Sequence, residues 1–422
     1  MPRSFVFLQG VTSPFFPRLA DRLASRGHRV QRVNFCAGDA LVWGRRPALS
    51  YRGRLGGLET FFARLFDHDG VSDLVLFGDE RPVHRPAIAL ARQRGITVHI
   101  FEEGYLRPDW FTLERQGVNA NSRLPHDPAW YLAVAPRLPR NADVAPTHPR
   151  LSARARHDMA YHLANLLNPL AYPGYRSHRP DTALLEYLGW ALRFAPLPWR
   201  RRRDARAIAR LIGRQHRYFL LPLQLNADVQ ITHHSPYRDM REVLSAVLTS
   251  FARHAPGDAR LVIKNHPLDT GLVHYQRFLK PIAADLGIAE RLQYLETGHL
   301  PTLLDHAAGV VTVNSTVGVS ALLHRAPTLA LGEAIYDVPG LTFQGGLDDF
   351  WTGASAPDRP LVDAFRKTVV HCTQINGDLY TDEGIAMALE SCVQRLEGDD
   401  LLAQLLPQAD TKLPRGVAEA TP

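Results

Sequence analysis

Short apolar runs alternate with segments of helical spacing in the first third of this chain, and this alternation limits its fold more than any other feature. The apolar runs occupy residues 4–9, 30–35, 74–77 and 97–101, and the helical segments occupy residues 15–26, 58–66 and 86–94. Strands and helices in this order predict a parallel sheet with crossover helices. Ligands bind at the carboxyl ends of such strands, so we expect the polar and glycine residues found there to form one site.

A second block with the same alternation begins near residue 218. Its apolar runs occupy residues 218–221, 260–263, 309–313 and 328–331, and its helical segments occupy residues 240–254, 276–286, 300–306 and 317–324. The stretch between the two blocks is rich in proline and then helical, with no strand signal. A helix is expected at residues 382–396, and the tail beyond it is polar.

These patterns predict five parts. They are an N-terminal Rossmann-like domain at residues 1–123, a helical and basic insert at 124–210, a second Rossmann-like domain at 211–375, a closing helix at 376–406 and a disordered tail at 407–422. Two α/β blocks facing one cleft, with a helical insert, describe the GT-B architecture of glycosyltransferases.

Composition narrows the classes of protein that fit. Hydrophobic residues make up 45% of the 422 residues, which excludes wholesale disorder. The three cysteines are far apart, which argues against a disulfide framework or a structural zinc site. The start of the chain does not resemble a signal peptide, and no run is long and apolar enough to predict a transmembrane helix. The net charge of +7 suggests an anionic partner: a nucleotide, an acidic sugar, a phospholipid surface or nucleic acid.

Two adjacent carboxylates, Glu102 and Glu103, follow an apolar run and precede Gly104. Neighbouring side chains of an extended backbone face opposite sides, so one carboxylate can face a cleft. Arg107 and Arg115 could hold one acid ionised or bind an anionic substrate. Retaining glycosyl transfer can use such a carboxylate as its nucleophile, whereas a bare Glu-Glu pair is more often an ordinary surface feature.

Two segments of the second block suit a phosphate group. Lys264 and His266 follow an apolar run, and cations of this kind bind phosphate. Ser315 and Thr316 precede a helix, whose free amides also favour anions. Alone, each segment fits a turn or a helix cap as well; together they predict a nucleotide phosphate site.

Two other segments are polar or basic. Residues 222–237 hold Gln224, Asp228 and two adjacent histidines, which we interpret as a loop lining the substrate. No metal is assigned, because the histidines lack the spacing of a metal motif. In residues 194–210, Trp199 lies beside four arginines. This segment suits an anionic bilayer surface, a solvated helix face or RNA, and no RNA-binding motif accompanies it.

Together, these segments resemble the KpsS/LipB family of capsule polysaccharide proteins from Phe7 to about Trp351. The resemblance rests on LQG near the start, GDERPVHRPA, FEEGYLRPDWFTLERQGVNANS, YPGYRSHRP, PLQLNADVQ, KNHPLD, VNSTVG and GEAIYDVPGLTFQGGLDDFW. It implies a GT-B, retaining β-Kdo transferase that uses CMP-Kdo as donor and needs no cofactor. It also implies that the first Kdo is added to a phosphatidylglycerol or lyso-phosphatidylglycerol acceptor, in the linker of a capsular polysaccharide.

The resemblance also implies roles for individual residues. Related two-module Kdo transferases carry Glu-Asp-Gly-aromatic at the position of Glu102 to Tyr105, which gives the nucleophile's role to Glu103 and leaves Glu102 or His84 as the base. The first domain is then the acceptor side and the second the CMP-sugar side. The remaining substrate-binding candidates are Gly10, Asp79, Arg81, Arg107, Asn119, Gln224 and Asp228. The nucleotide-binding candidates are Lys264, His266, Pro267, Asn314, Ser315, Thr316 and Glu333.

The implied location is the inner face of the cytoplasmic membrane of a Gram-negative bacterium, with a partner Kdo transferase and the capsule export complex and without nucleic acid. Two alternatives stay open. One is a non-catalytic adaptor that binds capsule lipid or the export machinery. The other is an inverting transferase with Glu103 or Asp228 as base.

Overall fold

The computed structural model describes residues 2–140, 144–177, 183–226 and 229–406. The chain forms two compact units, each assembled from separate segments. Unit 1 comprises Met1–Leu124, Pro139–Arg176 and Thr368–Pro422, and unit 2 comprises Pro125–Leu138 and Ser177–Lys367. The predicted disordered tail at 407–422 lies outside the described residues. In the part of the chain that the structure describes, no helix is long and apolar enough to cross a membrane.

Unit 1 is built on a seven-stranded sheet with the order β12-β6-β5-β4-β1-β2-β3. Its strands are β1 (Ser4–Phe7), β2 (Arg29–Asn34), β3 (Leu49–Ser50), β4 (Asp73–Phe77), β5 (Thr97–Glu103), β6 (Trp110–Arg115) and β12 (Gln374–Asn376). The strands from β5 to β3 in this order are parallel, as predicted. The chain runs outward in both directions from β1 and β4, and this switch in direction marks the ligand-binding edge of such sheets.

The predicted end of the strand at residue 101 is wrong, because β5 continues to Glu103. Glu102 and Glu103 are the last residues of β5 and pair with Thr112 and Phe111 of the antiparallel strand β6. The run Trp110–Arg115 has aromatic and β-branched residues that favour a strand, but no strand was predicted there. β12 extends the sheet beyond β6, so the two carboxylates belong to a rigid interior strand.

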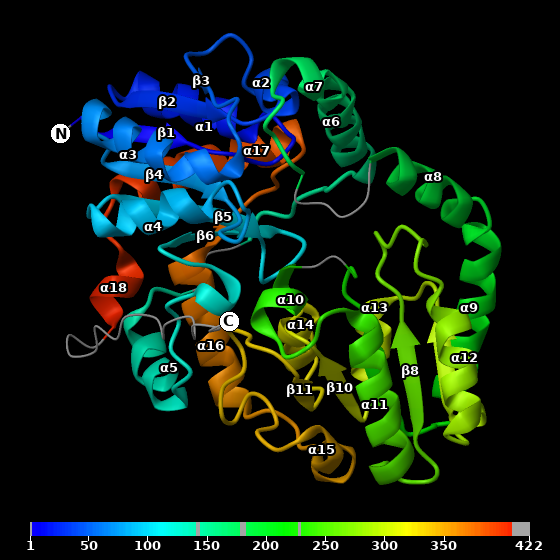
Figure 1. The fold of residues 1–422 in the computed structure, drawn as a ribbon. Helices are drawn as coiled ribbons and strands as arrows, with labels where there is room; N and C mark the ends of the chain where they lie inside the picture. The colour runs from blue at the N-terminus through cyan, green and yellow to red at the C-terminus, as the bar shows by residue number, and fades with distance from the viewer. Residues whose placement is uncertain (1, 141–143, 178–182, 227–228, 407–422) are drawn as a thin grey trace, which may run out of the picture. The chain divides into compact units, whose positions relative to one another are not determined.

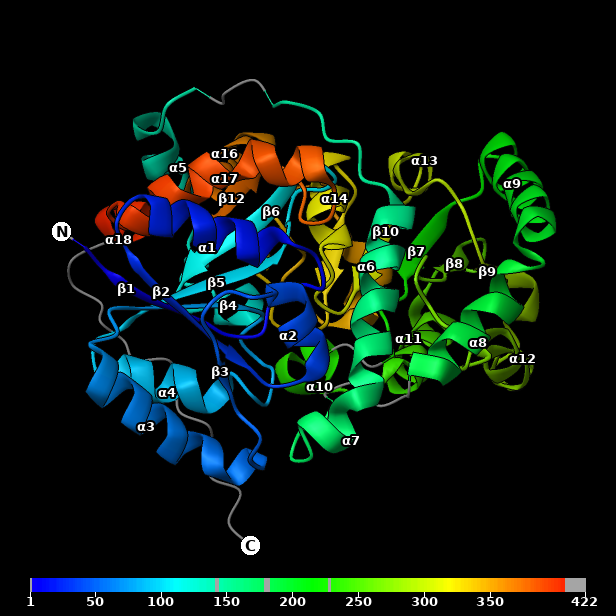
Figure 2. The ribbon, with the colours of Figure 1, turned by 90° about the horizontal axis from the view of Figure 1, so that it is seen from above.

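Helices cover both faces of this sheet (Figures 1 and 2). One face packs on α1 (Phe15–Ser25) and α17 (Asp382–Glu397), and the other packs on α3 (Leu58–Asp69) and α4 (Arg85–Gln93). The alternation of β1 explains how: Phe5 and Phe7 enter the first core and Val6 enters the second. Near the ligand-binding edge lie α2 (Ala37–Trp43), α6 (Leu151–Ala164) and α7 (Asn168–Ala171).

Unit 2 contains a five-stranded parallel sheet with the order β11-β10-β7-β8-β9. Its strands are β7 (Tyr218–Pro222), β8 (Arg260–Lys264), β9 (Leu292–Leu295), β10 (Gly309–Thr312) and β11 (Thr328–Ala330). The switch in direction falls between β7 and β10. Both Rossmann-like blocks expected from the sequence are therefore confirmed.

The helices of unit 2 enclose its sheet. One core includes α11 (Met240–His254), α12 (Tyr275–Asp285) and α15 (Leu347–Gly353), and the other includes α9 (Leu197–Gly213), α13 (Leu300–Asp305) and α14 (Val317–Leu323). The remaining helices are α5 (Pro128–Val134), α8 (Ala183–Phe194), α10 (Val229–His234), α16 (Arg359–Thr373) and α18 (Leu401–Leu405). The stretch predicted as a single insert contributes α6 and α7 to unit 1 and α8 and α9 to unit 2.

Candidate functional site

The loops after β1 and β4 of unit 1 meet through Arg81. Its guanidinium donates hydrogen bonds to the side-chain oxygen of Gln9 and the carbonyl oxygen of Gly10, each at 3.2 Å. Gly10 cannot carry a side chain, because a Cβ there would lie 2.5 Å from the ring of Phe16. The predicted residues Gly10 and Arg81 are therefore neighbours at the ligand-binding edge.

Asp79 connects the same edge to the segment after β6. It is buried, and its carboxylate accepts hydrogen bonds from the backbone N–H of Val118 at 3.2 Å and from the side chain of Asn121 at 3.1 Å. Burial raises the pKa of Asp79 above its ordinary value. The backbone N–H of Asn119 donates to the Tyr105 hydroxyl at 2.6 Å. Asp79 and Asn119 thus fix the loop that follows β6, the strand paired with the end of β5.

Glu102 lies partly buried at the end of β5. One carboxylate oxygen accepts the backbone N–H of Glu103 at 2.9 Å. The other lies near Gly78, where a Cβ would approach it to 3.3 Å. Burial raises the pKa of Glu102 to about 7, and the charge of Glu103 adds to the effect, while Arg81 opposes it. Glu102 can therefore take up or release a proton near neutral pH.

Glu103 has a different environment. Its Oε1 forms an ion pair with Arg154 at 2.9 Å and accepts a hydrogen bond from the Tyr380 hydroxyl at 3.0 Å. The Arg154 guanidinium also lies 4.6 Å from the centre of the Tyr380 ring. Burial alone would raise the pKa of Glu103, but the charges of Arg154 and Arg107 and the Tyr380 hydrogen bond outweigh it and lower the pKa. Glu103 is held ionised beside a carboxyl group that titrates near neutrality.

The sequence analysis did not identify Arg154 or Tyr380. Arg154 comes from α6, in the stretch predicted as an insert, and Tyr380 follows β12, 277 residues from Glu103. Neither residue lies in a local motif, so only the folded chain brings them together. Arg107, which was predicted, contributes its charge to Glu103 and donates a hydrogen bond to the carbonyl oxygen of Gly104 at 3.2 Å.

His84 lies at the start of α4 and is completely buried. Its Nδ1 is 2.7 Å from the carbonyl oxygen of Gly78. Gly78 has a φ of +71°, which favours glycine. His84 therefore holds the turn after β4 in this conformation.

In unit 2, the predicted Lys264, His266 and Pro267 follow β8 in one loop. The Lys264 ammonium is buried and donates to the carbonyl oxygen of Asn265 at 3.2 Å, and burial lowers its pKa. The Nδ1 of His266 accepts the backbone N–H of Leu268 at 3.1 Å, which leaves the proton of a neutral ring on Nε2. The loop thus holds a buried lysine and a histidine whose ring can donate from Nε2, and both residue types suit a phosphate.

Gln224 and Asn314 meet at the switch between β7 and β10. The Gln224 amide donates to the side-chain oxygen of Asn314 at 3.0 Å, and its oxygen accepts the backbone N–H of Asn314 at 3.2 Å. Ser315 and Thr316 follow directly and lead into α14, where the Ser315 hydroxyl accepts the N–H of Val317 at 3.2 Å. These four predicted residues form one edge of unit 2.

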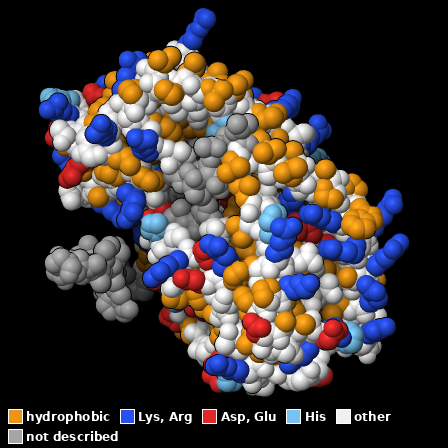
Figure 3. Space-filling model, turned by 45° about the vertical axis from the view of Figure 1, so that its right-hand side comes forward, with side chains coloured by type: hydrophobic (Ala, Val, Ile, Leu, Met, Phe, Trp, Pro, Cys, Tyr) orange, Lys and Arg blue, Asp and Glu red, His pale blue; other side chains and the backbone are white. Residues whose placement is uncertain are grey.

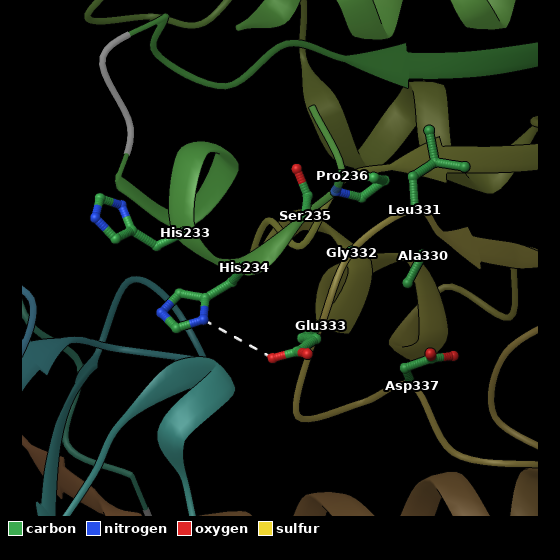
Figure 4. A pocket seen from close by; sticks show the side chains of 9 residues that line it. All are labelled: His233, His234, Ser235, Pro236, Ala330, Leu331, Gly332, Glu333 and Asp337. Atoms are coloured by element: carbon green, nitrogen blue, oxygen red, sulfur yellow. Dashed lines mark ion pairs between the residues drawn. The ribbon is translucent and has the colours of Figure 1, made fainter. Parts of the chain in front are cut away.

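A cavity of about 400 Å³ opens beside the end of β11 in unit 2. Its lining residues are His233, His234, Ser235, Pro236, Ala330, Leu331, Gly332, Glu333 and Asp337. In Figure 4, His234 points toward Glu333, and its Nδ1 lies 3.8 Å from a carboxylate oxygen of Glu333, whereas His233 points away. The predicted Glu333 therefore lines a space large enough for part of a nucleotide.

The polar loop expected at residues 222–237 is only partly correct. Val229–His234 forms the helix α10, so both histidines lie on a helix. The predicted Asp228 lies outside the described residues. Among the residues that the structure describes, no group of three or more His, Cys, Asp or Glu side chains could hold a metal ion.

Comparison with known proteins identifies the family. Residues 72–380 match the family described as capsule polysaccharide biosynthesis protein. The Escherichia coli capsule polysaccharide export protein KpsS is 36% identical over 383 residues, covering 90% of this chain and 97% of that protein. The capsule polysaccharide modification protein LipB of Neisseria meningitidis serogroup B is 35% identical over 384 residues, covering 90% and 92%.

Among solved structures, the β-Kdo 2,7 transferase of Thermosulfurimonas dismutans KpsC covers 94% of this chain and 100% of that chain, with 16% identity and a TM-score of 0.44. Structural similarity at this TM-score does not identify a family. The sequence identity to KpsS and LipB over nearly the whole chain does identify it, and it confirms the resemblance seen in the sequence. The chain belongs to the family of capsule polysaccharide biosynthesis proteins.

Proposed function

We propose that this chain is a retaining β-Kdo transferase that uses CMP-Kdo and adds the first Kdo to a phosphatidylglycerol-type lipid in the linker of a capsular polysaccharide. The observation that carries the proposal is the contrast between two adjacent carboxyl groups. Glu103 is held ionised by Arg154 and Tyr380, and burial raises the pKa of Glu102 to about 7. A nucleophile must stay ionised over a wide pH range, whereas a base must take up and release a proton near the working pH, so the two roles need these different pKa values.

The first step of the proposed reaction uses Glu103. Both of the contacts described above fall on Oε1, so Oε2 is the oxygen directed to the anomeric carbon of Kdo. A bond forms between Oε2 and that carbon, and the bond from the carbon to the phosphate oxygen of CMP breaks. The electron pair leaves with CMP, and Arg107 or Arg81 pairs with the carboxylate of the sugar.

The second step uses Glu102. The acceptor hydroxyl attacks the anomeric carbon, Glu102 takes its proton, and the bond to Glu103 breaks with its electron pair returning to the carboxylate. Two inversions at one carbon retain its configuration. Because His84 is buried against Gly78, Glu102 is the stronger candidate for the base.

Unit 2 supplies nucleotide binding in this proposal. Lys264, His266, Ser315 and Thr316 bind the CMP phosphate, where their cationic and N–H or O–H groups stabilise the departing charge. Pro267 shapes the first loop, and Gln224 and Asn314 hold the second. The cavity beside Glu333 receives another part of CMP.

The proposed location is the inner face of the cytoplasmic membrane of a Gram-negative bacterium, where the lipid acceptor lies. The proposed partners are a second Kdo transferase and the capsule export complex. The family, and relatives named as a capsule polysaccharide export protein and a capsule polysaccharide modification protein, support a place in capsule assembly.

The test is transfer by the purified protein alone. The wild type, incubated with CMP-Kdo and a fluorescent phosphatidylglycerol acceptor, should give a product one Kdo heavier and, without acceptor, a protein one Kdo heavier by mass. Glu103→Gln should lose both signals, and Glu80→Gln, a matched change on the loop after β4, should keep them. Normal transfer by Glu103→Gln would show that the nucleophile assignment is wrong. Absence of both hydrolysis and transfer in the wild type would favour the non-catalytic adaptor.

A further inference from the structure

Helix α8 of unit 2 presents a row of leucines to solvent. Leu185, Leu188 and Leu192 are 42%, 55% and 69% exposed. Their spacing of three and four residues places them on one side of the helix. Isolated exposed leucines are common, but three in a row on one helix are an apolar surface that needs a partner.

Helix α9 presents a different surface. Trp199, a large hydrophobic residue near the start of this helix, is 73% exposed. Arg202, Arg203, Arg206 and Arg210 follow it at helical spacing and are also exposed. The opposite side of α9 carries the buried residues Asp204 and Leu211. One face of the helix is therefore aromatic and cationic, and the other packs on unit 2.

Figure 3 shows the side of the molecule that carries these two helices. Hydrophobic side chains lie next to Lys and Arg side chains on this surface. The leucine row of α8 and the Trp199–arginine row of α9 follow each other directly along the chain, with only Ala195 and Pro196 between the helices. We refer to the two rows together as the α8–α9 surface.

Another side of α8 packs against the loop after β8, which holds Lys264, His266 and Pro267 and which we call the phosphate loop. Arg193 is buried and donates hydrogen bonds to the carbonyl oxygens of His266 and Pro267, each at 3.0 Å, and to that of Asp269. It also pairs with Glu296 at 2.6 Å. These contacts fix the position of the phosphate loop against α8.

Two further residues of α8 also contact the phosphate loop. The Trp190 indole donates to the carbonyl oxygen of Leu268 at 3.1 Å. At Gly189, a Cβ would lie 2.5 Å from the carbonyl oxygen of Thr270, so α8 approaches the loop more closely than any side chain would allow. The phosphate loop therefore packs against the side of α8 that lies next to the leucine row.

We infer that the α8–α9 surface docks on an anionic lipid bilayer. The leucines and Trp199 enter the boundary between headgroups and acyl chains, and the arginines bind the phosphates of the headgroups. A solvated helix face would not expose the leucine row, and RNA offers it no apolar partner. This inference deepens the proposed function, because it gives the membrane that holds the lipid acceptor a docking face on unit 2. The phosphate loop would then lie within one helix diameter, about 10 Å, of the bilayer.

The test measures binding to vesicles of phosphatidylcholine with and without phosphatidylglycerol, by co-sedimentation and in the absence of CMP-Kdo. The wild type should bind only vesicles that contain phosphatidylglycerol. The double variant Leu188→Ser/Leu192→Ser should bind at least about tenfold more weakly, because it removes apolar area from the contact. The double variant Arg202→Ser/Arg206→Ser should bind about 20-fold more weakly at low salt, and the difference should shrink at high salt.

Matched controls lie elsewhere on unit 2. Leu323→Ser changes a leucine that is 43% exposed on α14, and Arg253→Ser changes an exposed arginine on α11; both should bind vesicles like the wild type. Unchanged binding by both double variants would overturn the inference. So would equal loss in the control variants, or RNA that displaces the protein from vesicles through the same arginines.

A second measurement separates this inference from the proposed function. The double variants should transfer Kdo to a short-chain, water-soluble acceptor at the wild-type rate, because none of the four residues belongs to the proposed site. If Glu103→Gln proves fully active but the double variants fail to bind vesicles, the mechanism is wrong and the docking surface stands. Loss of transfer to the soluble acceptor in the double variants would instead show that α8 and α9 support the site structurally and would overturn the docking role.

Discussion

Replacing Glu102 by glutamine should change the pH dependence of both activity and stability. As the proposed base, Glu102 must be ionised, and burial raises its pKa to about 7. About half of the enzyme carries the ionised group at pH 7 and only about a tenth at pH 6, so kcat/KM should approach a plateau near pH 8 and lie about tenfold below that plateau at pH 6. Glu102→Gln should lower the plateau by about 100- to 10,000-fold and abolish the acid limb of the profile.

The effect on stability has the opposite sign. The folded protein holds the Glu102 proton more tightly than the unfolded chain, so this stabilisation is complete below about pH 4.5 and is lost as the pH rises to about 7. One pKa unit corresponds to about 1.4 kcal/mol, so the loss by pH 8 is about 3 kcal/mol. Glutamine stays neutral and avoids it. With about 2.1 cal/mol/K of unfolding entropy for each of the 422 residues, Glu102→Gln should raise the Tm at pH 8 by about 4 °C.

Glu114 offers a matched control. It is buried on β6, it accepts a hydrogen bond from the Tyr105 hydroxyl at 2.7 Å, and burial raises its pKa to about 7 as well. Glu114→Gln should therefore shift the Tm at high pH in the same direction but keep the acid limb of kcat/KM. An acid limb that persists in Glu102→Gln, measured on CMP-Kdo transfer between pH 5 and 9, would refute the assignment of Glu102 as the base.

Three further predictions concern residues that only the structure revealed. Arg154→Met should reduce transfer at neutral pH by about 10- to 100-fold, because without the guanidinium the pKa of Glu103 rises and less of the proposed nucleophile is ionised. Arg156→Met, which changes an exposed neighbour on α6, should transfer like the wild type in the same mass-based assay. Arg193→Lys should raise the KM for CMP-Kdo more than it lowers kcat and reduce the Tm, since the single nitrogen of lysine cannot span the three carbonyl groups and Glu296, which Arg193 reaches with three separate nitrogens. Gly189→Ala should destabilise the protein by about 1–3 kcal/mol in denaturant unfolding, whereas Gly213→Ala, where a Cβ meets nothing within 4 Å, should not; equal stability of the two variants would contradict the close approach of α8.

The sequence predicted the parallel strands and most helices well, because each is marked by a local spacing of apolar residues. The helix at Met240–His254 matches the prediction, and most other boundaries differ by only a few residues. The edges formed by Gly10, Asp79, Gln224 and Asn314 could be foreseen for the same reason, since parallel strands bring their carboxyl ends together.

The features that the sequence did not predict depend on contacts between residues far apart in the chain. The strand β6 became clear only because it pairs with β5, and β12 only because it pairs with β6. The two groups that keep Glu103 ionised come from an insert helix and from the segment after β12. The opposite pKa shifts of Glu102 and Glu103 could not be predicted from the sequence, because they depend on burial and on these partners.

The late position of Tyr380 has a consequence for the synthesis of this protein. Glu103 leaves the ribosome early, but the hydroxyl group that contacts it is made 277 residues later, and β12, the edge strand of the same sheet, only shortly before. The sheet of unit 1 therefore cannot be completed while the nascent chain is still short. The Glu103 carboxylate therefore gains the charges of Arg107 and Arg154 well before it gains the hydrogen bond of Tyr380, and its full set of partners forms only after residue 380 has been made.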